Sequence, residues 1–228
     1  MSRDLYAAYS GAAAAWRHLE VIANNVANAN SDGFREARVS FRLAESPEPG
    51  SPLQGAFAQV GEIAYSGTDG ALLQDGVSTH FALRGDGWFA LQDGTYTRDG
   101  RFRLDTEGNL VTQDGVGVMS DGGPIRIQQG ERISVDATGL APGSATGELG
   151  RLRIVKLDDV QALGGNRWSG RPVNGADATV LQGAREASNA DPMRGMVELL
   201  EASRYFEAQQ KAMQASDEMR SRLNRIQG

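Results

Sequence analysis

Both ends of this 228-residue chain repeat apolar residues at the three- and four-residue spacing of a helix, and few glycines interrupt them. Near the N-terminus the repeat runs from Leu5 to Val26, and near the C-terminus it runs from Leu199 to Leu223. Such spacing places apolar side chains along one stripe of a helix. The two ends are therefore predicted to be long helices that pack against each other and leave apolar surface that needs further neighbours.

Each predicted helix carries a boundary signal where it meets the middle of the chain. Asn30-Ser31-Asp32-Gly33 offers residues that end a helix in the left-handed conformation. Asp191-Pro192 offers an N-cap acceptor followed by proline at the first helical position. Asn24, Asn25 and Asn28 stand three and four residues apart, so they share a polar strip. This strip either sets the register of a helical interface or belongs to a frayed helix end.

The middle of the chain is divided by seven Asp-Gly pairs, a sequence that favours tight hairpin turns. The pairs stand at 69–70, 75–76, 86–87, 93–94, 99–100, 114–115 and 121–122. Short strands are predicted between and beyond them, at 79–83, 88–91, 95–97, 102–104, 110–112, 116–119, 125–127, 133–135 and 147–157. Short, regularly spaced strands are typical of antiparallel sandwiches and barrels.

The predicted fold class is therefore mainly β with terminal helices. An antiparallel, sandwich- or barrel-like β domain over 67–189 accompanies a paired helical coiled-coil domain made of 1–34 and 190–228. Residues 35–66 contain three prolines within a few positions, at 47, 49 and 52, and are predicted to be a linker or extended arm.

Composition excludes several classes of protein. The chain has no cysteine, which excludes disulfides and thiolate metal sites, and its only histidines are His18 and His80. A formal net charge of -6 at pH 7 and a pI near 5.0 disfavour nucleic-acid binding. Mean hydropathy is -0.40, and no apolar run approaches the ~20 residues of a membrane span. Polar residues interrupt the first 30 positions, so no cleavable signal peptide is expected.

Candidate chemistry is sparse. Each aspartate of the Asp-Gly pairs stands alone, whereas a calcium loop needs oxygen ligands at alternate positions, so turns are the favoured interpretation. Arg84-Gly85-Asp86 spells an adhesion tripeptide, but three residues match easily by chance. Neither histidine belongs to a nucleophile motif. No catalytic residue, cofactor or metal is predicted, although carboxylates brought together by the fold are not excluded by sequence.

The most specific segment runs from Val21 to Arg35 and contains Ala-Asn-Asn-Val-Ala-Asn followed by Gly-Phe-Arg. It resembles the N-terminal motif of the bacterial flagellar rod and hook proteins, in which leucine and lysine are usual at the positions of Val26 and Arg35. Three further blocks resemble the family in the same order: residues 85–100, 102–111 and 198–211. The resemblance covers nearly the whole chain.

The resemblance implies a non-enzymatic, structural subunit of the flagellar basal-body rod, which polymerises head to tail through its terminal helices and transmits torque for swimming. The implied partners are other copies, neighbouring rod proteins and the flagellar type III export apparatus, with no nucleic acid and no membrane insertion. The implied location is the periplasmic rod, reached without a cleavable signal peptide. Chain length and Asp-Gly-Trp at 86–88 resemble proximal-rod members more than distal-rod members, which stay the alternative.

Within that family, assembly contacts are expected on both terminal segments. The expected residues are Leu5, Tyr9, Trp16, Leu19, Asn24, Asn25, Val26, Asn28, Gly33, Phe34, Leu199, Phe206, Met213, Met219 and Leu223. The three asparagines are expected to set axial register. Two other hypotheses are a β-domain binding module on a coiled-coil stalk, with Trp88 and Trp168 as candidate contacts, and a peptidoglycan hydrolase. Neither explains why both termini carry apolar stripes.

Overall fold

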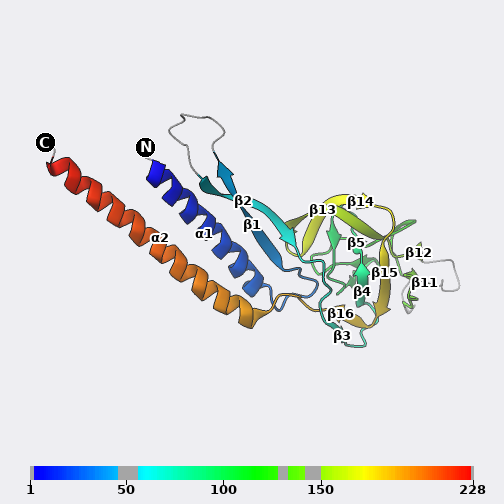
Figure 1. The fold of residues 1–228 in the computed structure, drawn as a ribbon. Coiled ribbons are helices and arrows are strands. Elements are labelled where there is room, and N and C mark those ends of the chain that lie inside the picture. The colour runs from blue at the N-terminus through cyan, green and yellow to red at the C-terminus, as the bar shows by residue number, and fades with distance from the viewer. Residues whose placement is uncertain (1–2, 46–55, 128–132, 142–149, 227–228) are drawn as a thin grey trace. The chain divides into compact units, whose positions relative to one another are not determined.

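The computed structural model describes residues 3–45, 56–127, 133–141 and 150–226 (Figure 1). The chain divides into two compact units. Residues 1–28, 36–66 and 190–228 form the helical unit, and residues 29–35 and 67–189 form the β unit. The described residues are mainly β with one helix near each terminus, which confirms the predicted fold class at that level.

In the helical unit, α1 (Arg3–Ala27) and α2 (Pro192–Ile226) lie side by side (Figure 1). They run antiparallel, because Trp16 meets Phe206 whereas Val26 meets Gly195. The predicted start of the second helix is confirmed: α2 begins at Pro192, and Asp191 Oδ1 accepts a hydrogen bond from the Met193 N–H at 2.9 Å. Among the described residues, no helix is both long and apolar enough to cross a bilayer.

A β-hairpin completes the helical unit. β1 (Ala37–Glu45) pairs antiparallel with β2 (Ala56–Tyr65), with a register shift between Val39 and Phe41, and both strands contact α1. The described part of the segment predicted as a linker or extended arm is thus a paired hairpin. The three prolines at 47, 49 and 52 lie outside the described residues.

Short antiparallel strands build the β unit. β13 (Ile154–Gly164), β14 (Arg167–Val173), β6 (Tyr96–Thr97) and β5 (Trp88–Ala90) pair in a closed order. The remaining strands form two-stranded ladders. These are β15 (Asp177–Gln182) with β4 (Phe81–Asp86), β16 (Ala184–Glu186) with β3 (Leu72–Gln74), β7 (Arg103–Leu104) with β8 (Leu110–Val111), β9 (Met119–Ser120) with β10 (Gly123–Pro124), and β11 (Leu140–Ala141) with β12 (Gly150–Arg151).

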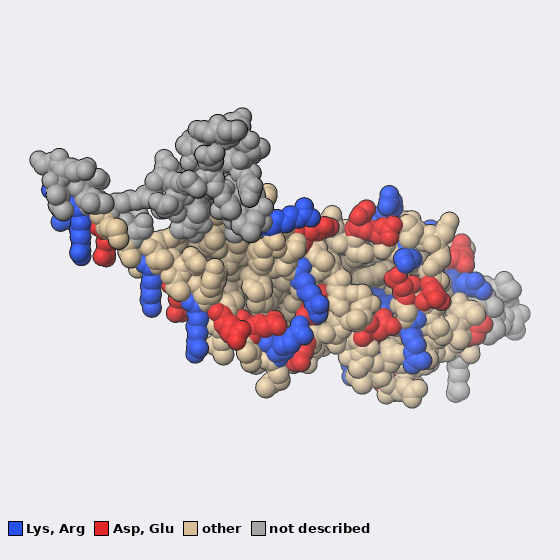
Figure 2. All heavy atoms as spheres, viewed as in Figure 1, with Lys and Arg blue, Asp and Glu red and all other residues tan. Residues whose placement is uncertain are grey.

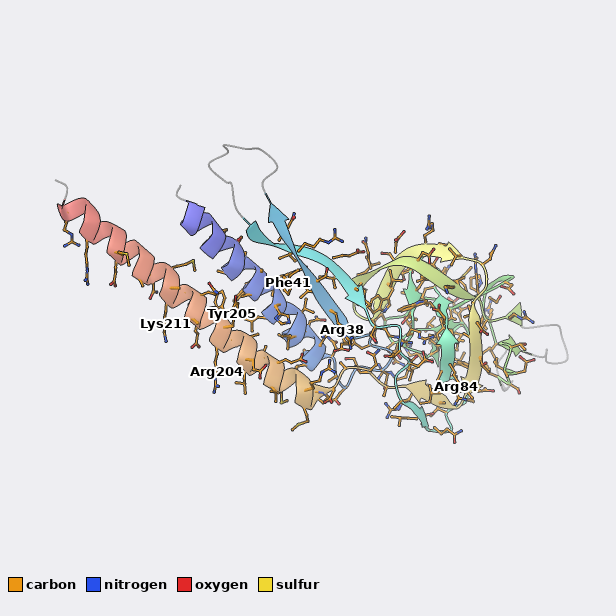
Figure 3. The ribbon with its side chains drawn as sticks, in the orientation of Figure 1. Arg38, Phe41, Arg84, Arg204, Tyr205 and Lys211 are labelled. Carbon is orange, nitrogen blue, oxygen red and sulfur yellow. The ribbon has the colours of Figure 1, made fainter. Side chains whose placement is uncertain are left out.

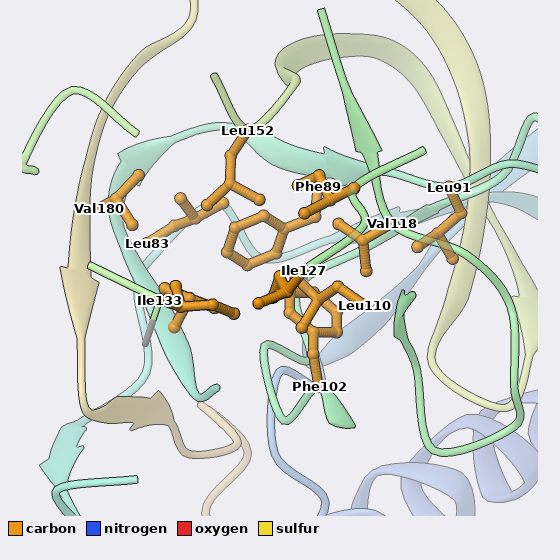
Figure 4. Close-up of a cluster of buried hydrophobic side chains, with 12 residues drawn as sticks. Leu83, Phe89, Leu91, Phe102, Leu110, Val118, Ile127, Ile133, Leu152 and Val180 are labelled. Atoms are coloured by element: carbon orange, nitrogen blue, oxygen red, sulfur yellow. The ribbon is translucent and has the colours of Figure 1, made fainter. Parts of the chain in front are cut away.

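The core of the β unit is a single cluster of aromatic and aliphatic side chains (Figure 4). Phe81, Leu83 and Phe89 are fully buried at its centre, and the Phe89 and Phe102 rings meet edge to face with centroids 5.2 Å apart. The strand predicted at 125–127 is reduced to an antiparallel bridge between Arg126 and Asn109, and no strand forms at 133–135. Ile125, Ile127 and Ile133 are buried in the same cluster.

The Asp-Gly pairs at 93–94, 114–115 and 121–122 connect segments that pair with each other, as predicted, whereas those at 69–70, 75–76, 86–87 and 99–100 connect strands that do not pair with each other. Local turn chemistry is nevertheless present at several of them. Gly76 and Gly94 have φ angles of 72° and 81°, in the left-handed region that glycine favours. Asp75 and Asp93 each accept a hydrogen bond from the backbone N–H two residues further on, at 3.0 Å. This is the local side-chain-to-backbone bond that makes aspartate a turn residue, as the sequence predicted.

Candidate assembly surface

The contact between α1 and α2 includes small residues. Ala15 of α1 and Ala202 of α2 are buried and line one groove between the helices. A Cβ added to Gly195 would lie 2.6 Å from Val26 Cγ2, so the helices approach closely where α2 begins. Alanine and glycine permit that approach because they carry little or no side chain.

Large residues stay at the edge of this contact or outside it. Trp16 and Phe206 have ring centroids 5.6 Å apart, yet Trp16 remains 54% exposed. Trp16, expected among the assembly contacts, thus lies at the edge of the helix pair, while Ala15 and Ile22 are buried.

The predicted assembly residues of the helical unit fall into two groups. Half-buried ones are Leu19, Asn25, Val26, Asn28, Leu199, Phe206 and Met213. Exposed ones are Tyr9, Trp16, Asn24 and Met219. Leu5 and Leu223 lie on the helices, and their side chains are outside the described part.

The start of α2 carries an apolar face that sequence reasoning did not single out. Met193, Met196, Val197 and Leu200 are 73%, 50%, 56% and 62% exposed, and their spacing puts them on one side of the helix. We call these four residues the α2 face. Val197 and Leu200 stand two positions and one position from Leu199, where the predicted stripe started, so the α2 face lies on a different side of the helix from that stripe.

Two of the predicted asparagines have roles inside the chain. The Asn25 side-chain amide donates to the Ala37 carbonyl at 2.8 Å, and its Oδ1 accepts from the Ala37 N–H at 2.9 Å. This reciprocal pair fixes the start of β1 against α1. Asn28 Nδ2 donates to the Asn24 carbonyl at 2.9 Å, at the end of the helix. An additional role of Asn24, Asn25 and Asn28 in axial register stays a prediction.

Gly33 and Phe34 belong to the β unit. Gly33 has a φ of 71°, and its N–H donates to the Glu186 carbonyl at 2.7 Å. A Cβ at this position would lie 2.4 Å from the Asp99 backbone nitrogen, so only glycine fits. Phe34 is half-buried, and its N–H donates to the Ser31 carbonyl at 3.2 Å. Within the chain, the Gly-Phe pair serves the packing of the β unit.

Next to Gly33, four charged residues form a network within the β unit. Arg35 Nη2 lies 3.0 Å from Asp69 Oδ1 and 3.0 Å from Glu186 Oε1. Arg98 Nη2 lies 2.6 Å from Asp69 Oδ1. Arg98 Nε lies 3.1 Å from Glu186 Oε2, and this second contact is an ion pair without the alignment of a hydrogen bond. The side chains of Arg35, Arg98 and Glu186 are 4%, 2% and 1% exposed. We call Arg35, Asp69, Arg98 and Glu186 the charge network.

Backbone groups satisfy much of the remaining hydrogen-bonding capacity. Arg98 Nη1 donates to the carbonyls of Gly85 and Gly87 at 3.0 and 2.6 Å, and the Gly70 N–H donates to Glu186 Oε1 at 2.9 Å. Burial raises the pKa of Glu186, opposed by the neighbouring guanidinium groups, and burial lowers the pKa of Arg98. Removing either partner would leave an uncompensated charge in the interior.

The charge network joins segments that are far apart in sequence. Arg35 follows α1 along the chain, and Glu186 closes β16 before the chain enters α2. Within the β unit, these two segments are therefore held together by buried ion pairs. From the sequence, Arg35 and Arg98 entered only as parts of the family-like segments 21–35 and 85–100, and Asp69 and Glu186 were not predicted as their partners. These two segments were the available signal.

These features indicate a class of protein. The described residues hold no group of three or more histidine, aspartate or glutamate side chains placed to bind a metal ion. An exposed apolar face on a helical pair is typical of subunits that associate with further chains. The chain thus has the features of a structural assembly protein.

Comparison with known proteins identifies the family. Residues 5–35 match the family described as flagella basal body rod protein, residues 82–141 match the flagellar hook protein FlgE/F/G D1 domain, and residues 181–226 match the flagellar basal body rod FlgEFG protein C-terminal family. The flagellar basal-body rod protein FlgF of Caulobacter vibrioides is 33% identical, covering 99% of this chain and 98% of the relative. This chain belongs to the flagellar basal-body rod protein family.

Other relatives carry two different names within this family. The FlgG protein of Bacillus subtilis is 31% identical, covering 98% of each chain. The FlgF protein of Escherichia coli is 29% identical, covering 99% of this chain and 98% of the relative. The similarity in each case runs through both helices and the β unit.

Proposed function

We propose that this chain is a structural subunit of the proximal part of the flagellar basal-body rod. It assembles with other copies and with neighbouring rod proteins, and the finished rod transmits motor torque for swimming. The observation that carries the proposal is full-length similarity to FlgF, combined with a helical pair that leaves several large apolar residues exposed, among them Trp16 and the α2 face. The proximal assignment also draws on the Asp-Gly-Trp sequence at 86–88.

Further parts of the proposal concern the form and route of assembly. The α1–α2 pair acts as a coiled coil in the polymer, with the β unit as a separate sandwich- or barrel-like domain. The chain reaches the periplasmic part of the basal body through the flagellar type III export apparatus and needs no cleavable signal peptide. It has no catalytic role.

The α2 face supplies the physical reason for assembly. Met193, Met196, Val197 and Leu200 are each at least half exposed in the isolated chain. Burying one such side chain fully contributes roughly 1.5–3 kcal/mol. Each neighbour that covers the α2 face therefore stabilises the polymer over the free subunit.

The test is deletion of the gene in the source bacterium, followed by swimming assays and electron cryotomography of basal bodies. We expect loss of swimming and a truncated rod, and the height of the remaining rod separates proximal from distal positions. Complementation with Leu200→Glu is expected to fail. Leu163→Glu is the matched control, because Leu163 is 57% exposed but lies on β13. Intact rods in the deletion strain would overturn the proposal.

A further inference from the structure

A shallow groove crosses the helical pair. It is lined by Ala15 and His18 of α1 and by Glu198, Glu201, Ala202 and Tyr205 of α2. The two alanines are 7% and 9% exposed and form its floor, while Tyr205 is 56% exposed on its wall. Tyr205 lies on the stretch of α2 labelled in Figure 3, together with Arg204 and Lys211. The groove has a volume of about 250 Å³, which suits one large side chain and is below the range of drug-sized ligand pockets.

Among the described residues, no helix lies beside the C-terminal turns of α2. Gly11 faces Gln209 and Gly195 faces Val26, so residue numbers rise along one helix as they fall along the other. Continuing this register places Arg3 opposite about residue 217. Roughly the last nine residues of α2 therefore extend beyond the first described turn of α1 (Figure 1).

This overhang carries side chains that match the groove. Met219 is 65% exposed, and Arg222 is also exposed. They stand three residues apart, so they share one side of the helix. Methionine fills irregular apolar gaps and makes favourable contacts with aromatic rings such as that of Tyr205. A flexible apolar side chain next to a cation is the complement of an alanine floor beside an acidic rim.

Charge favours the same pairing. Glu201 stands exposed on the groove rim, whereas Glu198 is engaged by Arg194 on its own helix at 3.1 Å. From Glu218 to the end of α2 the sequence holds one acidic residue and three arginines. Figure 2 shows acidic atoms gathered near the start of α2, with basic side chains projecting at intervals farther along it.

We propose that the groove receives the overhang of α2 from a second copy of this chain, with Met219 in the groove and Arg222 beside Glu201. This inference rests on the proposed function and adds the specific contact. Groove and overhang are different surfaces on one chain, so the contact is head to tail and extends to an open filament rather than closing as a dimer.

The absence of cysteine from the native sequence permits a direct test. A Glu201→Cys, Arg222→Cys double variant of the full chain is concentrated until it assembles and is then oxidised. Residues 201 and 222 are about 31 Å apart along one helix, whereas a disulfide needs Cα atoms within about 7 Å. Any disulfide is therefore intermolecular. We expect a ladder of dimers, trimers and larger species on non-reducing gels.

Two further sets of variants sharpen the experiment. A Glu207→Cys, Arg222→Cys variant is the matched control, since Glu207 is exposed on the same helix but does not line the groove, and we expect no ladder from it. Glu201→Arg is expected to raise the concentration needed for assembly by about two- to five-fold, the effect of an exposed ion pair. Arg222→Glu in the same chain is expected to restore it.

The outcomes separate this contact from the proposed function. Sedimenting polymer with no ladder, or a ladder equal to that of the control, overturns the contact and leaves the structural role intact. A product that stops at the dimer overturns the head-to-tail arrangement. A chain that neither sediments nor cross-links at any concentration contradicts self-assembly, and the contact falls with it.

Discussion

Replacing Glu186 tests whether the charge network holds the β unit together. Glu186→Ala removes the carboxylate that lies 3.0 Å from Arg35 and 3.1 Å from Arg98, and both guanidinium groups are at least 96% buried. Asp69 remains as their only partner within the network. Breaking a buried pair by removing one partner costs about 3–5 kcal/mol, because the other charge stays in the interior without compensation. For a domain stable by about 5–15 kcal/mol, this is a large fraction.

The assay is urea unfolding followed by tryptophan fluorescence. Trp88 and Trp168 lie in the β unit with ring centroids 5.1 Å apart, so a Trp16→Phe background restricts the signal to that unit. With a slope of about 1–3 kcal/mol per molar urea, the midpoint should fall by roughly 2 M. Glu186→Gln keeps an oxygen that can accept from the Gly70 N–H but removes the charge. It should therefore lower the urea midpoint by most of the amount expected for Glu186→Ala.

The control is an ion pair at the surface. Asp158 and Arg171 lie 3.4 Å apart, and their side chains are 46% and 70% exposed. Asp158→Ala should change the free energy of unfolding by about 0–1 kcal/mol. If Glu186→Ala behaves like Asp158→Ala, the buried ion pairs of the charge network stabilise the β unit no more than a surface pair does.

Three further predictions concern single positions. Gly33→Ala should destabilise the β unit by clearly more than Gly76→Ala. Both glycines have φ near +70°, but only at Gly33 does a backbone atom lie within 3 Å of the added Cβ. Chemical denaturation should give a loss of about 1–2 kcal/mol in the free energy of unfolding for Gly76→Ala. Asn25→Ala should lower the free energy of unfolding by about 1–3 kcal/mol, because the backbone N–H and carbonyl of Ala37 lose their hydrogen bonds to the Asn25 side chain. Asn24→Ala should change it by no more than about 0.5 kcal/mol, and thermal unfolding of the two variants can compare them. The pKa of Asp69 lies below its ordinary value of 3.8, because hydrogen bonds from Gly85 and Arg35 and the charges of Arg98 and Arg35 together outweigh its desolvation. The stability that its charge contributes is therefore fully present above pH 3.8 and is lost as pH falls through the lower pKa of the folded state. The difference in free energy of unfolding between the native chain and Asp69→Asn should shrink over that acidic range, which denaturation at several pH values can measure.

Local signals allowed part of this structure to be predicted. The start of α2 at Pro192 follows from one capping aspartate and one proline, and the turns at Asp75 and Asp93 follow from side-chain bonds that span two residues. Each of these depends on neighbours in the chain, and a sequence displays neighbours directly.

The charge network could not be predicted in this way. Glu186 and Arg35 are far apart in sequence, and a charged residue is ordinarily assigned to the surface because burial without a partner is costly. Only the fold brings the partner into place. The β1–β2 hairpin escaped prediction for a related reason, since its partners are strands separated by a proline-rich segment and its support comes from α1.

The burial pattern of α1 shows why helical spacing predicts an apolar side of a helix but not which of its residues are buried. Trp16 and Ala15 are both apolar neighbours, and spacing alone favours the larger residue as the one to bury, because it removes more apolar area from water. The pair instead buries Ala15 and Ala202, which lets the backbones approach, and leaves Trp16 and Tyr205 more than half exposed. Residue size alone does not decide which residues are buried, because Ile22 is 4% exposed. Position relative to the partner helix decides it: Trp16 lies at the edge of the pair against Phe206, and its exposed part is open to contact with another chain.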